Sequence, residues 1–172
     1  MADFQPAFER MIVNEGGYVL HQEQGDRGGL TYAGIARNMN PQWPGWAHVD
    51  RGDTPPSQLV RDFYLAGYWQ PLRGDEINEQ RVAETLFDFA VNTSAPGRPA
   101  VAVKLAQVVV GTTPDGVLGP RTLQALNFME PELFLARYAL AKLARYRDIC
   151  ARDKTQRQFL FGWLNRTLKE AQ

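Results

Sequence analysis

The sequence predicts a mainly α-helical protein with a small β-rich patch near one end. Apolar side chains recur every three or four residues over most of the chain, which is the spacing of amphipathic helices. The period breaks between residues 16 and 35, where glycines are too frequent for a helix. No repeat or low-complexity segment interrupts the 172 residues, and this length suits one compact body with a real core.

The first helix is expected from about Phe4 to Asn14. Asp3 or Gln5 lies near its N-cap, and Pro6 falls in the first turn, where a missing N–H is tolerated. The helix should end at the glycines that follow, because glycine readily adopts the left-handed conformation of a C-terminal cap.

The glycine-rich stretch predicts a short hairpin or a pair of extended segments, at residues 18–20 and 30–32. The next segment, residues 38–56, is rich in proline and predicts a surface loop or short helices. Ser57 can cap the helix that comes after it. Helices are then expected over residues 57–69, 79–92, 101–110, 121–127, 131–153 and 155–169.

Composition excludes several classes of protein. The chain is 44% hydrophobic and 22% charged, as in ordinary globular proteins, and no apolar run approaches the roughly 18 residues of a membrane span. Residues 1–6 lack the features of a signal peptide, so we expect synthesis in the cytoplasm and no stable membrane insertion.

One cysteine, Cys150, excludes an internal disulfide. Two histidines, His21 and His48, are too few for a Cys/His zinc site, so no metal or cofactor is expected.

The zero net charge conceals a split between the two halves of the chain. Residues 1–80 carry six Lys and Arg against eleven Asp and Glu, whereas residues 81–172 carry thirteen against eight. The second half therefore suits contact with an anionic polymer. Its basic residues are scattered along helices without a nucleic-acid motif, so bacterial cell wall fits at least as well as nucleic acid.

Glu15 is a candidate general acid because it lies on the apolar stripe of the first helix. Phe8, Met11 and Ile12 occupy the same face, so the Glu15 side chain should point inward. Burial disfavours a charged carboxylate, so Glu15 would keep its proton nearer neutral pH and could donate it to a leaving oxygen. The glycines at 16–17 leave space beside this carboxyl. The alternative is a capping turn whose Glu15 side chain faces solvent.

Cleavage of a glycosidic bond usually needs a second carboxylate that stays ionised. Asp26 is the candidate, because its loop and the neighbouring Arg27 favour the charged form. The hydroxyl of Thr31 could hold a water against Asp26, and Glu23 is a competing second carboxylate. The alternatives are a turn-forming Asp26 and a Thr31 chosen for strand propensity.

Aromatic side chains offer further contacts to a sugar. Tyr18 and Tyr32 flank the candidate carboxylates in sequence and are expected either to bind substrate or to pack in the core. The same alternatives hold for Trp43 and Trp46.

Two motifs together resemble the signature of the family 108 glycoside hydrolases. Glu-Gly-Gly-Tyr at residues 15–18 is followed by Asp-x-Gly-Gly-x-Thr-x-x-Gly-Ile at residues 26–35. The resemblance continues into the family's helical peptidoglycan-binding region at residues 87–92, 105–107, 115–122 and 162–166.

The resemblance implies a mainly α, α+β lysozyme-like fold and the activity of an N-acetylmuramidase. Members occur among phage endolysins and bacterial secretion-associated proteins. The family motif places the catalytic acid on Glu15, and analogy with phage lysozymes places water activation on Asp26 with Thr31. The turn at residues 115–122 is either a device between helices or a site where Asp115 and Arg121 bind glycan or stem peptide.

The expected function is hydrolysis of the β-1,4 bond between N-acetylmuramic acid and N-acetylglucosamine, without metal or cofactor. Residues 1–80 are expected to form the catalytic half and residues 81–172 a peptidoglycan-binding half, packed as one body. A lytic transglycosylase and a non-enzymatic wall-binding protein are the alternatives. We expect a monomer that binds peptidoglycan strands, not nucleic acid, and that leaves the cytoplasm through a holin-type pore or a secretion system.

Overall fold

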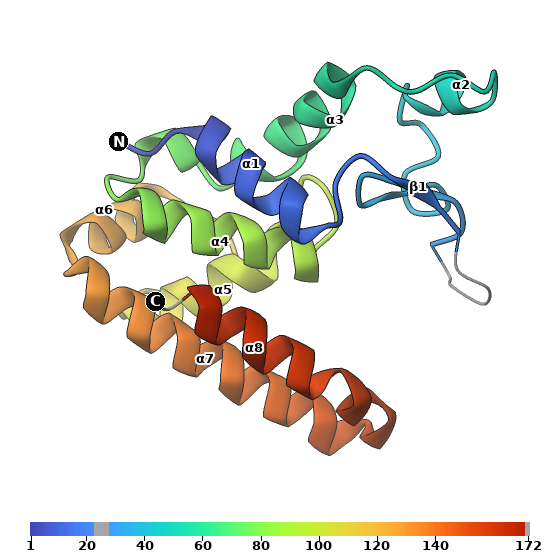
Figure 1. The fold of residues 1–172 in the computed structure, drawn as a ribbon. Coiled ribbons are helices and arrows are strands. Elements are labelled where there is room, and N and C mark those ends of the chain that lie inside the picture. Colours follow the sequence, from blue (N-terminus) through green and yellow to red (C-terminus); the bar gives the residue numbers. More distant parts are fainter. Residues whose placement is uncertain (23–27, 171–172) are drawn as a thin grey trace.

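The computed structural model describes residues 1–22 and 28–170 (Figure 1). Within this part of the chain, helices dominate and a three-stranded antiparallel sheet forms a small patch, so the predicted mainly helical fold is confirmed. The α-helices are α1 (Phe4–Asn14), α2 (Trp46–Val49), α3 (Ser57–Tyr64), α4 (Gln80–Thr93), α5 (Ala100–Val110), α6 (Pro120–Phe128), α7 (Pro131–Arg152) and α8 (Leu160–Glu170). The strands are β1 (Leu20–His21), β2 (Thr31–Tyr32) and β3 (Ile35–Ala36).

Helix α1 begins and ends where the sequence predicts. The Asp3 side chain accepts a hydrogen bond from the backbone N–H of Gln5 and caps the first turn. At the other end the N–H of Gly17 donates to the carbonyl of Ile12 at 2.8 Å, and the N–H of Gly16 donates to Val13 at 3.2 Å. This pair of bonds is a Schellman cap, and it requires the positive φ of 86° at Gly16.

The β patch is a meander rather than the single predicted hairpin. Strand β1 pairs with β2, as expected, and β2 also pairs with β3, which was not expected. The β2–β3 turn consists of Ala33 and Gly34, with φ values of 50° and 77°. Two successive positive φ angles give a hairpin turn that matches the twist of the strands. The Tyr64 hydroxyl donates to the Ala33 carbonyl at 2.9 Å and holds this turn against α3.

Helix α4 lies at the centre of the helical body (Figure 1). Its residues 82–90 are all buried, and it packs against α1, α5 and α7. Phe87 is fully buried and contacts the rings of Phe4 and Trp69 edge-on. Both Phe87 and Phe89 therefore belong to the core.

Trp43 and Trp46 also pack in the core. Their exposed fractions are 6% and 3%, and their rings meet edge-on. Each indole N–H donates to a backbone carbonyl, of Leu59 and Asn40 respectively. The rings thus support the loop that precedes α3.

Three boundaries differ from expectation. Ser57 is the first residue of α3 rather than its cap, and its side chain makes no capping hydrogen bond. The helix predicted over residues 57–69 changes at Leu65–Trp69 into a π-helix. The last predicted helix is split, because a 3₁₀ segment at Lys154–Phe159 precedes α8.

Among the described residues, no helix combines the length and the apolar character needed to cross a membrane.

Candidate active site

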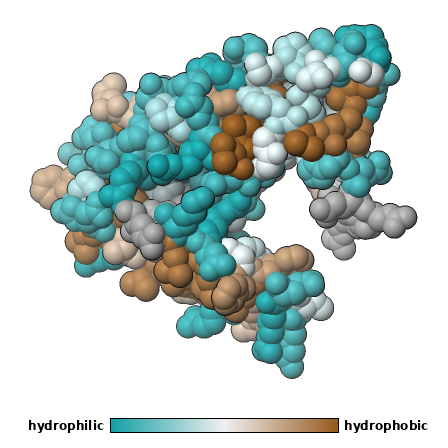
Figure 2. Space-filling view, in the orientation of Figure 1, coloured by the Kyte–Doolittle hydropathy of each residue, from teal (hydrophilic) through white to brown (hydrophobic). Residues whose placement is uncertain are grey.

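The candidate site lies where four elements meet: the end of α1, the β2–β3 turn, the end of α4 and helix α8. Figure 2 shows the surface deeply hollowed between the part of the molecule that carries the β patch and the α7–α8 hairpin. The helices α7 and α8 pack side by side below this hollow (Figure 1). A polymer chain could therefore approach the ends of α1 and α4 from solvent.

Glu15 occupies the C-cap of α1 and is partly buried. Its side chain is 22% exposed, as the position on the apolar stripe predicts. Gly34 lies directly against it: a Cβ at this position would be 3.2 Å from Oε2 of Glu15 and 2.5 Å from the Tyr64 hydroxyl. At Gly16 and Gly17 no atom lies within 4 Å of where a Cβ would be, so the glycines leave open space next to the carboxyl.

Arg166 of α8 is the cation that faces Glu15. Its Nη2 lies 3.6 Å from Oε1 of Glu15, and its Nε lies 4.0 Å from Oδ2 of Asp88. The same guanidinium donates a hydrogen bond to the side-chain oxygen of Asn92. One arginine near the C-terminal end thus bridges the ends of α1 and α4.

Asp88 is the second described carboxylate at this site. Its side chain is 10% exposed. Asn14 donates to Oδ1 at 3.4 Å, and Asn92 donates to Oδ2 at 3.2 Å. These hydrogen bonds and the nearby Arg166 hold the Asp88 side chain in place beside Glu15.

The surroundings of Glu15 suit a proton donor. Burial raises the pKa of Glu15, Arg166 opposes this shift, and the negative charge of Asp88 adds to it. The net direction is upward, so more of the protonated form survives toward neutral pH than for an exposed glutamate. Burial and the Glu15 carboxylate also raise the pKa of Tyr68 to about 12, so this phenol stays neutral beside the site.

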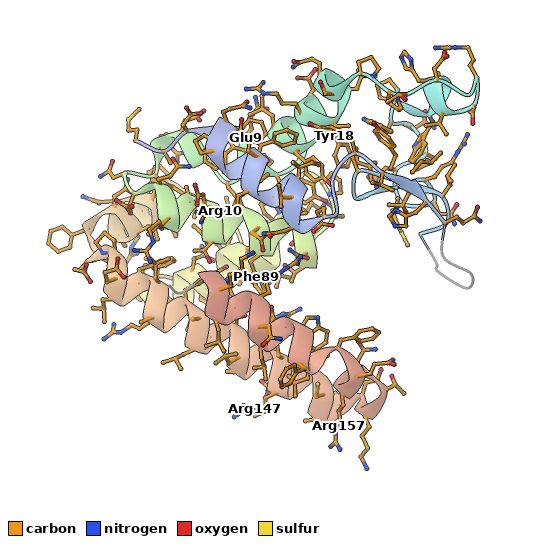
Figure 3. All side chains as sticks on the ribbon, viewed as in Figure 1. Glu9, Arg10, Tyr18, Phe89, Arg147 and Arg157 are labelled. Atoms are coloured by element: carbon orange, nitrogen blue, oxygen red, sulfur yellow. The ribbon has the colours of Figure 1, made fainter. Side chains whose placement is uncertain are left out.

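The predicted residues of the β patch have different environments. Tyr18 is 43% exposed, follows the α1 cap and remains available for contact with substrate; it is labelled in Figure 3. Tyr32 is 3% exposed and stacks on Trp43, so most of its ring belongs to the core. Thr31 is buried in β2, and its hydroxyl donates to the Gly29 carbonyl at 3.2 Å. Substrate contact by these residues stays a prediction.

Asp26 and Glu23, the two candidates for the second catalytic carboxylate, lie outside the described residues. The role of Asp26 with Thr31 therefore stays a prediction.

Asp115 lies in the turn before α6, and Arg121 lies in the first turn of α6. This helix is on the side of the molecule away from the β patch (Figure 1). The Asp115 carboxylate accepts hydrogen bonds from the Gln107 amide at 2.7 Å and from the backbone N–H of Val117 at 2.8 Å. These bonds hold the turn before α6 and lower the pKa of Asp115. The structure does not bring this turn to Glu15, and its binding of glycan or stem peptide stays a prediction.

Sequence reasoning assigned no role to Asp88, Asn92 or Arg166. All three lie in segments that resemble the family's peptidoglycan-binding region, at residues 87–92 and 162–166, but nothing in these segments indicated that the side chains would lie near Glu15. Only the packing of α4 and α8 brings them to the end of α1. Within residues 1–22 and 28–170, no three His, Cys, Asp or Glu side chains gather as they would around a metal ion.

Comparison with known proteins matches both halves of the chain. Residues 8–93 match the family model described as Glycosyl hydrolase 108, and residues 101–168 match the model described as Predicted Peptidoglycan domain. A solved structure of SagA from Brucella abortus is similar, with a TM-score of 0.66 and 25% sequence identity over 98% of this chain and 95% of that one. No curated protein sequence matches.

Proposed function

This chain belongs to the glycosyl hydrolase 108 family, and from that premise we propose that it hydrolyses the β-1,4 bond between N-acetylmuramic acid and N-acetylglucosamine. Membership makes the chain a glycoside hydrolase, and the second matched domain makes peptidoglycan its partner. The finer activity, that of a muramidase, rests on the site around Glu15.

The observation that carries the proposal is the position of Glu15, partly buried at the C-cap of α1 with open space beside Gly16 and Gly17. Burial there raises its pKa. A general acid must hold its proton until the bond between the anomeric carbon and the glycosidic oxygen breaks. Glu15 donates the proton to that oxygen and becomes a carboxylate. Arg166, whose Nη2 lies 3.6 Å away, stabilises this carboxylate until it is protonated again.

Asp88 acts through Glu15 in this proposal. Asn14 on α1 and Asn92 on α4 hold it in place, and its negative charge adds to the rise that burial gives the pKa of Glu15. We assign activation of the attacking water to Asp26 with Thr31, by analogy with the order of Glu, Asp and Thr in phage lysozymes.

A lytic transglycosylase is the second candidate. Its reaction needs one acid/base glutamate, with a hydroxyl of the sugar itself as nucleophile. Within the described part of the chain, the carboxylate beside Glu15 is Asp88, which is occupied by Asn14, Asn92 and Arg166 rather than free to hold a water. This observation favours the lytic transglycosylase.

Mass spectrometry of digested peptidoglycan separates these activities. We expect soluble muropeptides with reducing N-acetylmuramic acid ends. Anhydro-muramic ends would assign a lytic transglycosylase instead. If the protein binds the wall but releases no soluble fragment, it is a wall-binding protein and the proposal is wrong.

We further propose that the protein acts as a monomer on the cell wall, outside the cytoplasmic membrane where peptidoglycan lies. A holin-type pore or a dedicated secretion route would deliver it there. Fractionation of producing cells, with and without a co-expressed holin, tests the first route.

A further inference from the structure

A pocket of about 460 Å³ lies between the end of α4 and the α7–α8 hairpin. Its walls include Arg145 and Tyr146 from α7, Trp163 and Arg166 from α8, and Asn92 from α4. Arg166 also faces Glu15, so the pocket adjoins the candidate active site. The catalytic proposal assigns this pocket no role.

Arg145 has an unsatisfied donor in this pocket. Its Nε–H is buried and has no hydrogen-bond partner among the described residues. A buried donor without a partner is costly, and most such groups in folded proteins are satisfied by protein, water or ligand. A ligand that enters the pocket meets Arg145 in its wall, so it needs a hydrogen-bond acceptor for the guanidinium.

The charge of the pocket indicates what that acceptor is. Its described lining has two arginines and no Asp or Glu. A guanidinium matches a carboxylate in shape, because two parallel N–H groups can bind its two oxygens. Trp163 stacks on Tyr146 with ring centroids 4.9 Å apart, and this rigid aromatic pair adds a flat wall for the group that carries the carboxylate.

We propose that this pocket binds a carboxylate of the peptidoglycan substrate, with Arg145 as the principal donor. The proposal rests on the proposed function for its substrate. Two sources supply this chemistry: the stem peptide and the lactyl group of muramic acid. Because Arg166 lines the pocket and faces Glu15, the carboxylate belongs to the strand that lies in the hollow and helps to position its scissile bond.

The test is a binding titration followed by NMR on the ¹⁵N-labelled full chain. The probes are an N-acetylmuramyl dipeptide with free glutamyl carboxylates, N-acetylmuramic acid with its free lactyl carboxylate, and chitobiose, which has neither. We expect the Arg145 Nε–H and Trp163 indole resonances to shift with one or both carboxylates. Shifts with the dipeptide alone identify the stem peptide, and shifts with N-acetylmuramic acid alone identify the lactyl group. Shifts with both show that the pocket accepts either carboxylate.

Variants test the same assignment. Arg145→Gln should weaken binding of the carboxylate probe about tenfold, the loss expected for one charged hydrogen bond. Arg145→Lys should retain part of the affinity, because it keeps the positive charge but loses the two parallel N–H groups of the guanidinium. The matched control is Arg147→Gln on the same helix. Arg147 pairs with Asp148, its side chain is 76% exposed, and it lies outside the pocket on the lower side of the hairpin in Figure 3.

The outcomes separate this proposal from the catalytic one, because binding does not require turnover. Unchanged Arg145 and Trp163 resonances with every probe, or equal shifts with chitobiose, would overturn the carboxylate pocket even if the protein digests peptidoglycan. Selective binding by a protein that releases no muropeptides would support the pocket and refute the muramidase. If Arg145→Gln fails to fold, the resonances of the parent and the Arg145→Lys affinity decide.

Discussion

Glu15 stands between two charges of opposite sign. Arg166 lowers its pKa and Asp88 raises it, while burial contributes the largest effect and raises it. A general acid works best when its pKa lies near the pH at which the enzyme operates. The pH dependence of activity is therefore the property most directly tied to these two neighbours.

Substitution of the two neighbours should move the alkaline limb of the kcat/KM profile in opposite directions. Arg166→Gln removes the cation that favours the carboxylate, so the pKa of Glu15 rises and the limb shifts to higher pH. Asp88→Asn removes the anion that disfavours the carboxylate, so the limb shifts to lower pH. A pH–rate series on peptidoglycan measures both. Shifts in the same direction would contradict the assigned electrostatics.

The pH dependence of the free energy of unfolding should also reflect the pKa of Glu15. The pKa of Glu15 is higher in the folded state than in the unfolded state, so the folded state binds more protons between the two values. Stability conferred by the protonated side chain is present below the unfolded pKa and is lost as pH rises through the folded pKa. Glu15→Gln mimics the protonated form. We expect its free energy of unfolding, relative to the parent, to increase from acidic to neutral pH.

Urea unfolding at several pH values measures this difference. Glu9→Gln serves as the control, because Glu9 is exposed on the same helix α1 (Figure 3). A relative stability of Glu15→Gln that falls as pH rises would show that Arg166 outweighs burial.

At the scale of elements, the β2–β3 turn fits closely against the Glu15 side chain. Gly34 has a φ of 77° and lies against both Glu15 and Tyr64. Only a residue without a Cβ fits there. The hydrogen bond from the Tyr64 hydroxyl to the Ala33 carbonyl holds this turn in place.

Gly34→Ala should impair activity far more than a matched glycine substitution elsewhere. The left-handed conformation costs a non-glycine residue about 1–2 kcal/mol. Gly52 has a similar φ of 81° and no atom within 4 Å of a Cβ, so Gly52→Ala carries this cost alone. Gly34→Ala adds a clash with Tyr64 and Glu15. Thermal unfolding and hydrolysis rates of both variants test this prediction. Equal activities of the two variants would show that the turn does not belong to the active site.

Most helices could be predicted from the sequence because their apolar period and their caps are local. The prediction of α1 is accurate for this reason, from Asp3 at its N-cap to the glycine cap at its end. The third strand, β3, was missed because its two residues are too few to show the alternation of apolar and polar side chains by which a strand is recognised. The π-helix before Gln70 was missed because it depends on tertiary packing rather than on composition.

Only part of the candidate site could be predicted. Glu15 was found because its motif and its place on the apolar stripe are local. Asp88 and Arg166 come close to it through the packing of α4 and α8, from positions 73 and 151 residues further along the chain. No local pattern records such a contact.

On the scale of the whole molecule, the two matched segments meet at one site. Arg166 lies within the segment that matches the peptidoglycan domain, and Glu15 lies within the segment that matches the hydrolase family. The proposed boundary at residue 80 stays a prediction, but the second segment places a side chain beside Glu15. Its excess of Lys and Arg also favours binding of an anionic polymer.

Binding to the cell wall should therefore weaken with salt. We expect the Glu15→Gln protein to bind purified peptidoglycan less as ionic strength rises from 0.1 M to 1 M, because the screening length falls from about 10 Å to about 3 Å. Co-sedimentation measures the bound fraction. Chitin, an uncharged glycan, is the control and should show little salt dependence. Salt-independent binding to peptidoglycan would mean that the basic half does not act through its charge.

The hydrolysis rate of Glu15→Gln on purified peptidoglycan is the most direct measurement of the catalytic role of Glu15. Loss of a general acid costs about 10²- to 10⁴-fold in rate. We expect a loss of this size in a protein that is folded by circular dichroism, while Glu9→Gln retains the rate of the parent. If Glu15→Gln digests peptidoglycan as fast as the parent, Glu15 is not the general acid.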